Sequence, residues 1–109
     1  MRILIADGES ACRELLKVMC RGHRISEAKH STDALRLSDK VDLILTDIGF
    51  PGLSGDEYIN ALKRRSLAKI IVITAWIDYE NTKVDDIILK PIDRKTVLSI
   101  IDKYDTKKS

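Results

Sequence analysis

Four short apolar segments, separated by amphipathic stretches, constrain the fold more than any other feature of this chain. They are rich in Ile, Leu and Val and do not alternate between polar and apolar residues, which is typical of parallel strands covered on both faces. Strands that alternate with helices favour right-handed crossovers and a doubly wound sheet. The four segments are Ile3–Ala6, Val41–Thr46, Ile70–Thr74 and Ile87–Leu89.

A fifth segment and four amphipathic stretches complete the predicted α/β fold. Arg24–Ala28 alternates in polarity and is predicted to form an edge strand. The other stretches carry apolar residues at helical spacing, and Asp93 stands where the last helix needs an N-cap. We therefore predict a doubly wound, five-stranded parallel sheet with helices on both faces. The predicted helices cover residues 10–21, Thr32–Ser38, Gly55–Arg65 and 93–104.

The crossover after the third strong segment is unusually short. Only residues 75–85, "AWIDYENTKVD", connect it to the next strand. A complete crossover needs at least about 10–12 residues. We therefore expect a shortened fourth helix of one or two turns here, or an irregular segment.

Length and composition indicate a single globular domain over residues 1–109. The apolar share is 44%, the charged share is 33%, and the net charge of +2 is too small and too evenly spread to indicate a nucleic-acid or membrane partner. No apolar run reaches the roughly 20 residues of a membrane span. Cys12 and Cys20 are about 12 Å apart on the predicted helix, too far for a disulfide. We expect two reduced thiols in a cytoplasmic protein.

Polar side chains stand at the carboxyl ends of the four strong segments. These residues are Asp7, Asp47, Thr74 and Lys90, the last followed by Pro91. Ligands of an open parallel sheet bind outside the carboxyl ends of its strands. Two carboxylates can hold Mg²⁺, and a carboxylate can also act as the nucleophile that forms an aspartyl-phosphate. A lysine and a hydroxyl would then bind phosphoryl oxygens, which is most of what phosphoryl transfer requires.

The segments that carry these residues resemble the receiver domain of response regulators, the CheY-like phosphoacceptor of two-component signalling. The matching stretches are "ILIAD", "DLILTDIGFPGLSG", "IIVITA" and "DDIILKPID", in the order that the family has them. The resemblance covers essentially the whole chain. It implies that Asp47 accepts a phosphoryl group from a histidine kinase or a phosphotransfer protein.

The resemblance also assigns roles around the phosphoacceptor. It implies that Asp7 belongs to an acidic pair that binds Mg²⁺, and that Gly49 offers its backbone carbonyl to the metal. Thr74 would be the switch hydroxyl, Lys90 would pair with the phosphate, and the peptide bond before Pro91 would be cis.

The two residues that follow Thr74 bear on access to the phosphate. Ala75 is small, as is usual in the family, and leaves room for a phosphodonor. Trp76 is either a packed or half-exposed aromatic residue in a loop or a lid that controls access of water to the phosphate.

The chain departs from the family at the metal site. Receivers carry two adjacent acids after the first strand, but here the second position is Gly8. We expect weaker Mg²⁺ binding, because such sites depend on very few acids. Glu9 could replace the missing ligand, but we expect it in the first turn of the following helix, where the helix dipole favours it.

The chain also departs from the family in its signalling surface. Ile87 stands where receivers place Tyr or Phe as a rotamer switch, and an isoleucine has no ring to move between exposed and buried states. The shortened crossover alters a second part of that surface. We therefore expect the usual readout of phosphorylation to be altered.

Two functions remain open, and two others are disfavoured. The first is a phosphoacceptor that assists its own phosphorylation and is not a turnover enzyme. The second is a phosphorylation-independent pseudo-receiver that docks an unknown downstream protein. A haloacid-dehalogenase-like phosphatase would need an acid at Gly49, and a Rossmann domain would need a glycine-rich loop after the first strand. Because the chain ends after its last predicted helix, we expect a stand-alone receiver.

Overall fold

The computed structural model describes residues 1–49 and 51–105, which form one five-stranded sheet flanked by helices. All strand pairs are parallel, and the strand order is β2-β1-β3-β4-β5. The predicted strands are therefore confirmed, including the edge position of the second. The strands are β1 (Arg2–Ala6), β2 (Arg24–Ala28), β3 (Leu43–Thr46), β4 (Lys69–Thr74) and β5 (Asp86–Leu89).

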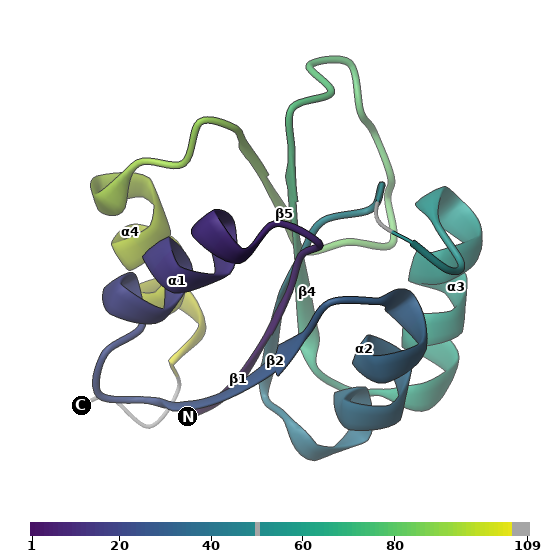
Figure 1. Ribbon diagram of the computed structural model, residues 1–109, viewed down its shortest axis with the longest axis horizontal. Helices are drawn as coiled ribbons and strands as arrows, with labels where there is room; N and C mark the ends of the chain where they lie inside the picture. Colours follow the sequence, from purple (N-terminus) through teal and green to yellow (C-terminus); the bar gives the residue numbers. More distant parts are fainter. Residues whose placement is uncertain (50, 106–109) are drawn as a thin grey trace.

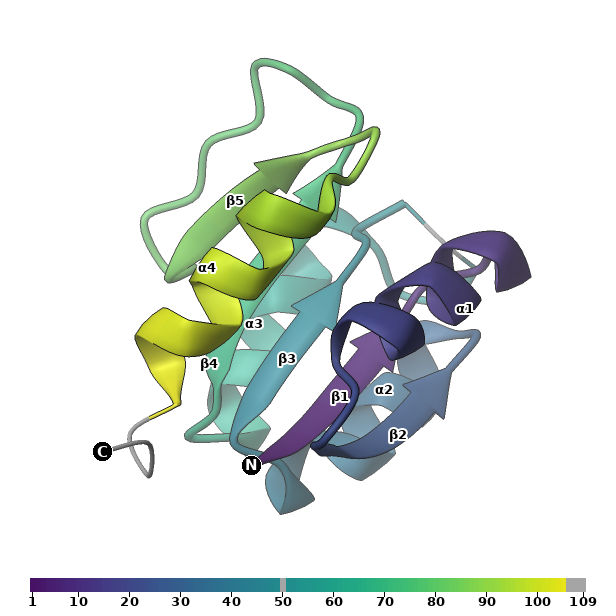
Figure 2. The same cartoon turned by 90° about the vertical axis from the view of Figure 1, so that its left-hand side faces the viewer.

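The helices cover the two faces of the sheet in pairs. Helices α1 and α4 lie on one face, and α2 and α3 lie on the other (Figures 1 and 2). Asp93 caps α4 as predicted, because its carboxylate accepts a hydrogen bond from the backbone N–H of Lys95. The helices are α1 (Ser10–Met19), α2 (Ser31–Leu37), α3 (Gly55–Arg65) and α4 (Arg94–Tyr104), with a 3-10 turn at Ser38–Lys40.

Alternate residues of each central strand enter two different cores, which explains why these strands lack polar positions. On β1, Leu4 and Ala6 pack toward α2 and α3, whereas Ile3 and Ile5 pack toward α1 and α4. All four side chains are at most 1% exposed. Continuous burial of this kind holds the strand ends in fixed positions relative to one another.

The crossover between β4 and β5 contains no helix. Residues 75–85 form turns and irregular structure, drawn as the long green loop in Figures 1 and 2. The shortened fourth helix is therefore not formed, and the irregular alternative is the correct one. The segment is near the minimum length of a crossover. After the chain has left β4 and turned into β5, too few residues remain to repay the cost of starting a helix.

Contacts to α3 replace the missing helix. Tyr79 is 7% exposed and belongs to the core under α2 and α3. Asn81 donates a hydrogen bond of 2.9 Å to the carboxylate of Asp56, at the start of α3. The loop is thus attached to α3, while Ile87 and Leu89 on β5 remain 36% and 46% exposed.

Two further observations concern the cysteines and the length of the helices. Cys12 and Cys20 are both free thiols. None of the helices formed by the described residues has both the length and the apolar character that a bilayer crossing requires.

Candidate functional site

The carboxyl edge of the sheet brings together three of the four polar residues in direct contact. Asp7 follows β1, Asp47 follows β3 and Lys90 follows β5. Each is held by a hydrogen bond from its own backbone N–H to a neighbouring strand, to Ala28, Ala6 and Thr74 respectively. The side chains meet because all the strands of a parallel sheet end at the same edge. Asp7 and Asp47 follow adjacent strands, and the long side chain of Lys90 reaches them from β5, on the far side of β4.

The ammonium group of Lys90 lies between the two carboxylates. Its Nζ is 3.1 Å from Asp7 Oδ2 and 3.3 Å from Asp47 Oδ2. Burial by itself would lower the pKa of Lys90, but the hydrogen bond to Asp7 and the charges of Asp47 and Asp7 outweigh it and raise that pKa above its ordinary value. Lys90 therefore stays charged and offsets the repulsion between the two carboxylates.

Asp47 is positioned at both of its carboxylate oxygens and is still accessible. Its Oδ1 accepts hydrogen bonds from the backbone N–H groups of Ile48 at 2.7 Å and of Gly49 at 3.3 Å. Its Oδ2 faces Lys90, and its side chain is 19% exposed. An oriented and accessible carboxylate is what a nucleophile at this position requires.

Asp7 is more buried than Asp47 and is held by its neighbours. Its side chain is 2% exposed, and its Oδ1 accepts a hydrogen bond of 2.9 Å from the backbone N–H of Glu9. The thiol of Cys12 also bonds to this carboxylate. Burial, then this bond to Asp7, raises the pKa of Cys12 to about 12, so the group remains a thiol at neutral pH.

The donors available to Mg²⁺ are few but of the right kind. Asp7 and Asp47 present carboxylate oxygens, which this hard cation prefers, and Gly49 lies next to the Asp47 carboxylate. Within residues 1–49 and 51–105, no three or more His, Cys, Asp or Glu side chains are grouped to hold a metal. The set fits a cation that keeps most of its own water.

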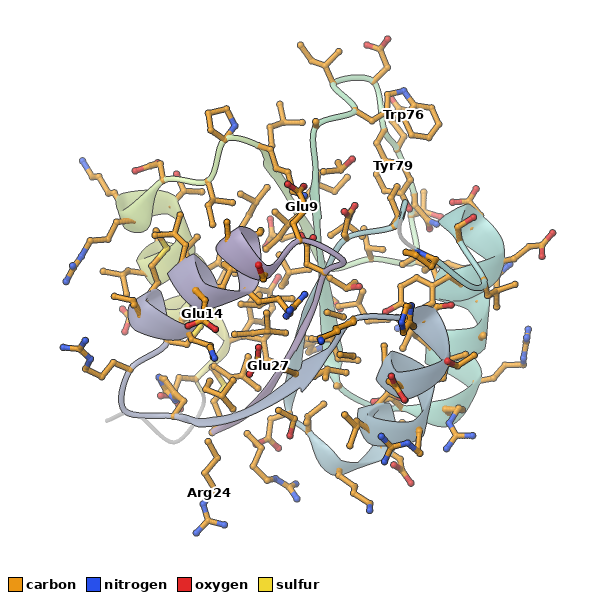
Figure 3. The ribbon with its side chains drawn as sticks, in the orientation of Figure 1. Glu9, Glu14, Arg24, Glu27, Trp76 and Tyr79 are labelled. Carbon is orange, nitrogen blue, oxygen red and sulfur yellow. The ribbon has the colours of Figure 1, made fainter. Side chains whose placement is uncertain are left out.

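Glu9 does not lie where the sequence predicts it. It is the N-cap residue of α1, before the first turn, and its backbone is extended. The extended backbone of Glu9 places it before the helix, and its N–H donates a hydrogen bond to Asp7 Oδ1. Its side chain is 75% exposed, and its Oε1 is 3.7 Å from Lys90 Nζ (Figure 3). Glu9 therefore lies at the edge of the site, where its carboxylate pairs with the ammonium group of Lys90.

Thr74 connects the site to the irregular crossover. It is the last residue of β4, is 5% exposed, and its Oγ1 accepts a hydrogen bond of 3.1 Å from the backbone N–H of Trp76. The Trp76 ring is 59% exposed and lies against the Tyr79 ring, with centroids 5.6 Å apart (Figure 3). Ala75, which lies between Thr74 and Trp76 in the chain, is exposed.

Two further predicted positions lie on or after β5. The Lys90–Pro91 peptide bond is cis, the isomer that the resemblance implies. Ile87 on β5 is exposed and belongs to neither of the two cores formed by the described residues.

The sequence interpretation missed two groups that support the site. Arg13 is 7% exposed and donates a hydrogen bond to the backbone carbonyl of Asp7. Thr46 Oγ1 donates to the backbone carbonyl of Asp47 and lies 2.8 Å from the hydroxyl of Tyr58. Two signals were available in the sequence. Arg13 is a charged residue on the same helix face as Leu16, and Thr46 is a threonine at the end of an otherwise apolar strand.

Residues 3–102 match the response regulator receiver domain family, and the chain belongs to this family. Receivers are phosphoacceptor domains of two-component systems, interact with histidine kinases or phosphotransfer proteins, and generally bind Mg²⁺. The structure has the CheY-like fold of this family.

Three similar proteins illustrate the match. Response regulator TrrA of Thermotoga maritima, solved in complex with Mg²⁺ and BeF, is 31% identical, with a TM-score of 0.82 over 94% of this chain and 97% of that one. A cyclic di-GMP phosphodiesterase of the same organism is 33% identical over 84% of this chain and 27% of its own length. The transcriptional regulatory protein ResD of Bacillus subtilis is 30% identical over 89% and 45%. The chain thus spans less than half the length of these two curated relatives.

Proposed function

We propose that this receiver accepts a phosphoryl group on Asp47, with Mg²⁺ as cofactor, from a histidine kinase or a phosphotransfer protein. The observation that carries the proposal is the position of the Lys90 ammonium, within 3.3 Å of both Asp7 and Asp47. A carboxylate nucleophile beside a fixed ammonium group is suited to an incoming phosphoryl group, because the ammonium neutralises part of the negative charge as the group is transferred.

In the proposed reaction, a carboxylate oxygen of Asp47 attacks phosphorus as the bond between phosphorus and the donor histidine nitrogen breaks. The donor imidazole leaves with the electron pair of that bond. Lys90 moves from the carboxylates to a phosphoryl oxygen, and the Thr74 hydroxyl donates to another. When bound, Mg²⁺ neutralises phosphoryl charge, and Asp7, Asp47 and the carbonyl of Gly49 would hold it. We place this reaction in the cytoplasm, where Cys12 and Cys20 stay reduced.

The test uses a small phosphodonor, such as radiolabelled acetyl phosphate, with Mg²⁺. We expect label on the wild-type protein and none on Asp47→Ala. Asp39→Ala removes an exposed aspartate of the same chain and serves as the matched control, with labelling equal to wild type. In parallel, Mg²⁺ and beryllofluoride should produce a saturable change in Trp76 fluorescence that Asp47→Ala abolishes.

The alternative is a pseudo-receiver that docks a partner in one fixed state. Gly8, Ile87 and the crossover without a helix favour it, because they remove a metal ligand and two parts of the usual readout. If the wild-type protein takes no label and its fluorescence does not respond at any Mg²⁺ concentration, the phosphoacceptor proposal is wrong and this alternative replaces it.

A further inference from the structure

Arg13 is a buried charged residue that the proposed chemistry does not use. It lies on α1 and its side chain is 8% exposed. Removing a guanidinium group from water is unfavourable unless partners satisfy its charge and its donors. Its partners therefore indicate why a charge is kept at this position.

The guanidinium joins the end of β1 to the edge strand. Its Nη1 donates a hydrogen bond of 2.8 Å to the backbone carbonyl of Asp7, and its Nε donates one of 3.3 Å to Glu27 Oε1 on β2. Lys17 Nζ bonds the other oxygen of Glu27 at 3.0 Å and also pairs with Glu14. Figure 3 shows Glu14 on α1 and Glu27 on β2.

The carbonyl of Asp7 needs such a donor because the chain leaves the sheet at this point. The register of β1 with its neighbours ends at Ala6, and the N–H of Asp7 makes the last bond, to Ala28. A buried carbonyl without a donor is costly. Arg13 supplies the donor, so Asp7 is held on both sides of its Cα atom.

The residue that follows increases the need for this bond. Gly8 has no side chain and more conformational freedom than any other residue type. Residues 7 and 8 are where the family has its pair of acids, and here only Asp7 remains. The direction of that one carboxylate is set at its oxygens by the N–H of Glu9 and by Lys90, and Arg13 fixes the backbone carbonyl of the same residue.

We propose that Arg13, held by Glu27, is a positioning residue that orients the Asp7 carboxylate toward a divalent cation. The proposal rests on the proposed function, because it concerns the same metal site. Arg13 bonds the backbone of Asp7 and not its carboxylate, so it acts on the metal through Asp7.

Electrostatics alone predicts the opposite effect of removing Arg13. Loss of a positive charge near the site should strengthen the binding of a cation. Loss of a positioning contact should weaken it, typically by about 10- to 100-fold for groups that orient a metal ligand. The sign of the change in affinity therefore separates the two explanations.

The experiment measures the affinity of the full chain for Mn²⁺, used as a probe of the Mg²⁺ site, from the electron paramagnetic resonance signal of free Mn²⁺. We expect Arg13→Met to bind about 10- to 100-fold more weakly than wild type. Arg36→Met, which removes the same charge from the exposed Asp33–Arg36 pair, should bind like wild type. Unfolding in the absence of metal is measured for each variant to confirm that it is folded.

A second pair of variants tests the positioning role of Arg13 if Arg13→Met does not fold. Glu27→Gln and Glu14→Gln each remove one negative charge and one partner of Lys17, but only Glu27 contacts Arg13. We expect about tenfold weaker Mn²⁺ binding for Glu27→Gln and no change for Glu14→Gln.

Other results overturn the inference. If wild type binds Mn²⁺ and the folded Arg13 or Glu27 variant binds it equally well or better, Arg13 has no positioning role, whereas the phosphoacceptor proposal stands. If wild type binds no Mn²⁺ and takes no label from a phosphodonor, the metal-dependent function fails and this inference fails with it.

Discussion

The edge of the sheet that carries Asp47 and the crossover that follows Thr74 differ sharply in how closely they follow the receiver family. At the edge, Asp7, Asp47 and Lys90 are in contact, and each follows a strand whose backbone is paired. In the crossover, a helix is replaced by a loop attached to α3, and on the following strand β5 Ile87 and Leu89 are left exposed. The difference teaches that the cluster at the sheet edge can keep the family's arrangement while the crossover departs from it.

The physical basis of this separation is the way that each part is held. The strand ends are fixed by two apolar cores, which leave them little freedom. The loop is fixed mainly by one buried ring, Tyr79, and by polar contacts to α3. The Trp76–Thr74 hydrogen bond joins the two regions, but we expect that changes in the crossover leave the strand ends in place.

The largest expected effect is on stability in the crossover. Tyr79→Ala removes a buried ring, and we expect about 3 kcal/mol less free energy of unfolding in urea, as for other large core truncations. Tyr79→Phe keeps the ring, loses only the contacts of its hydroxyl with Asp56 and Asn81, and should lose less than about 1 kcal/mol. Mn²⁺ affinity should be unchanged in both. A parallel loss of metal affinity in the alanine variant would show that the two regions are coupled.

The next effect concerns Lys90 at high pH. The pKa of Lys90 in the folded protein is raised above its value in the unfolded chain, which is near 10.5. The stability that its charge contributes is therefore present below pH 10.5 and is lost as pH rises further. We expect Lys90→Met to be less stable than wild type by about 2 kcal/mol at pH 8, the value of a hydrogen bond to a charged group. This gap should close as pH rises above 10.5. Urea unfolding at a series of pH values measures it, and a constant gap would contradict the assignment.

A gain of affinity is expected from restoring the missing acid. Gly8 does not have the positive φ that would disfavour a side chain. Among the described residues, the glycines with positive φ are Gly22, Gly52 and Gly55. We expect Gly8→Asp to bind Mn²⁺ about tenfold more tightly, because Mg²⁺ sites of this type depend on few carboxylates. Gly8→Ala controls for the change in backbone freedom. Equal affinity in the Asp and Ala variants would mean that residue 8 is not a ligand position.

The smallest effect is expected on the outer part of β5. Ile87→Thr keeps a β-branched side chain on an exposed strand position, so its free energy of unfolding should stay within about 0.5 kcal/mol of wild type. The same variant should take label from a phosphodonor at the wild-type rate. A loss of more than about 1.5 kcal/mol would mean that Ile87 is covered in the folded protein, and the contrast between the two regions would weaken.

Much of the fold follows from local patterns in the sequence. All five strands, the edge position of β2, the N-cap Asp93 and the limits of α3 agree with the predictions. Apolar runs and helical spacing are strong signals because they record burial. The crossover was harder to predict, because "AWIDYENTKVD" carries no clear period. Its conformation depends on the packing of Tyr79 in the core under α2 and α3.

The candidate site was predictable only in part. Residues that end strands can be identified from the sequence, but the contacts between them cannot. Glu9 shows the difference, because the dipole predicted it in the first turn of the helix, whereas it is the extended N-cap residue and its N–H donates to Asp7. Arg13 shows it too, because its partners are 6 and 14 residues away along the chain.

The sequence by itself determined the order of strands and helices and the four polar residues at the strand ends, because burial and strand termini leave a local record in residue type. Only the tertiary structure decided that Lys90 lies between Asp7 and Asp47, that Arg13 holds the Asp7 carbonyl, and that the loop after Thr74 packs on α3. Apart from the one between Arg13 and Asp7, these contacts join residues far apart in the chain, and the geometry of all of them depends on how the strands and helices pack together.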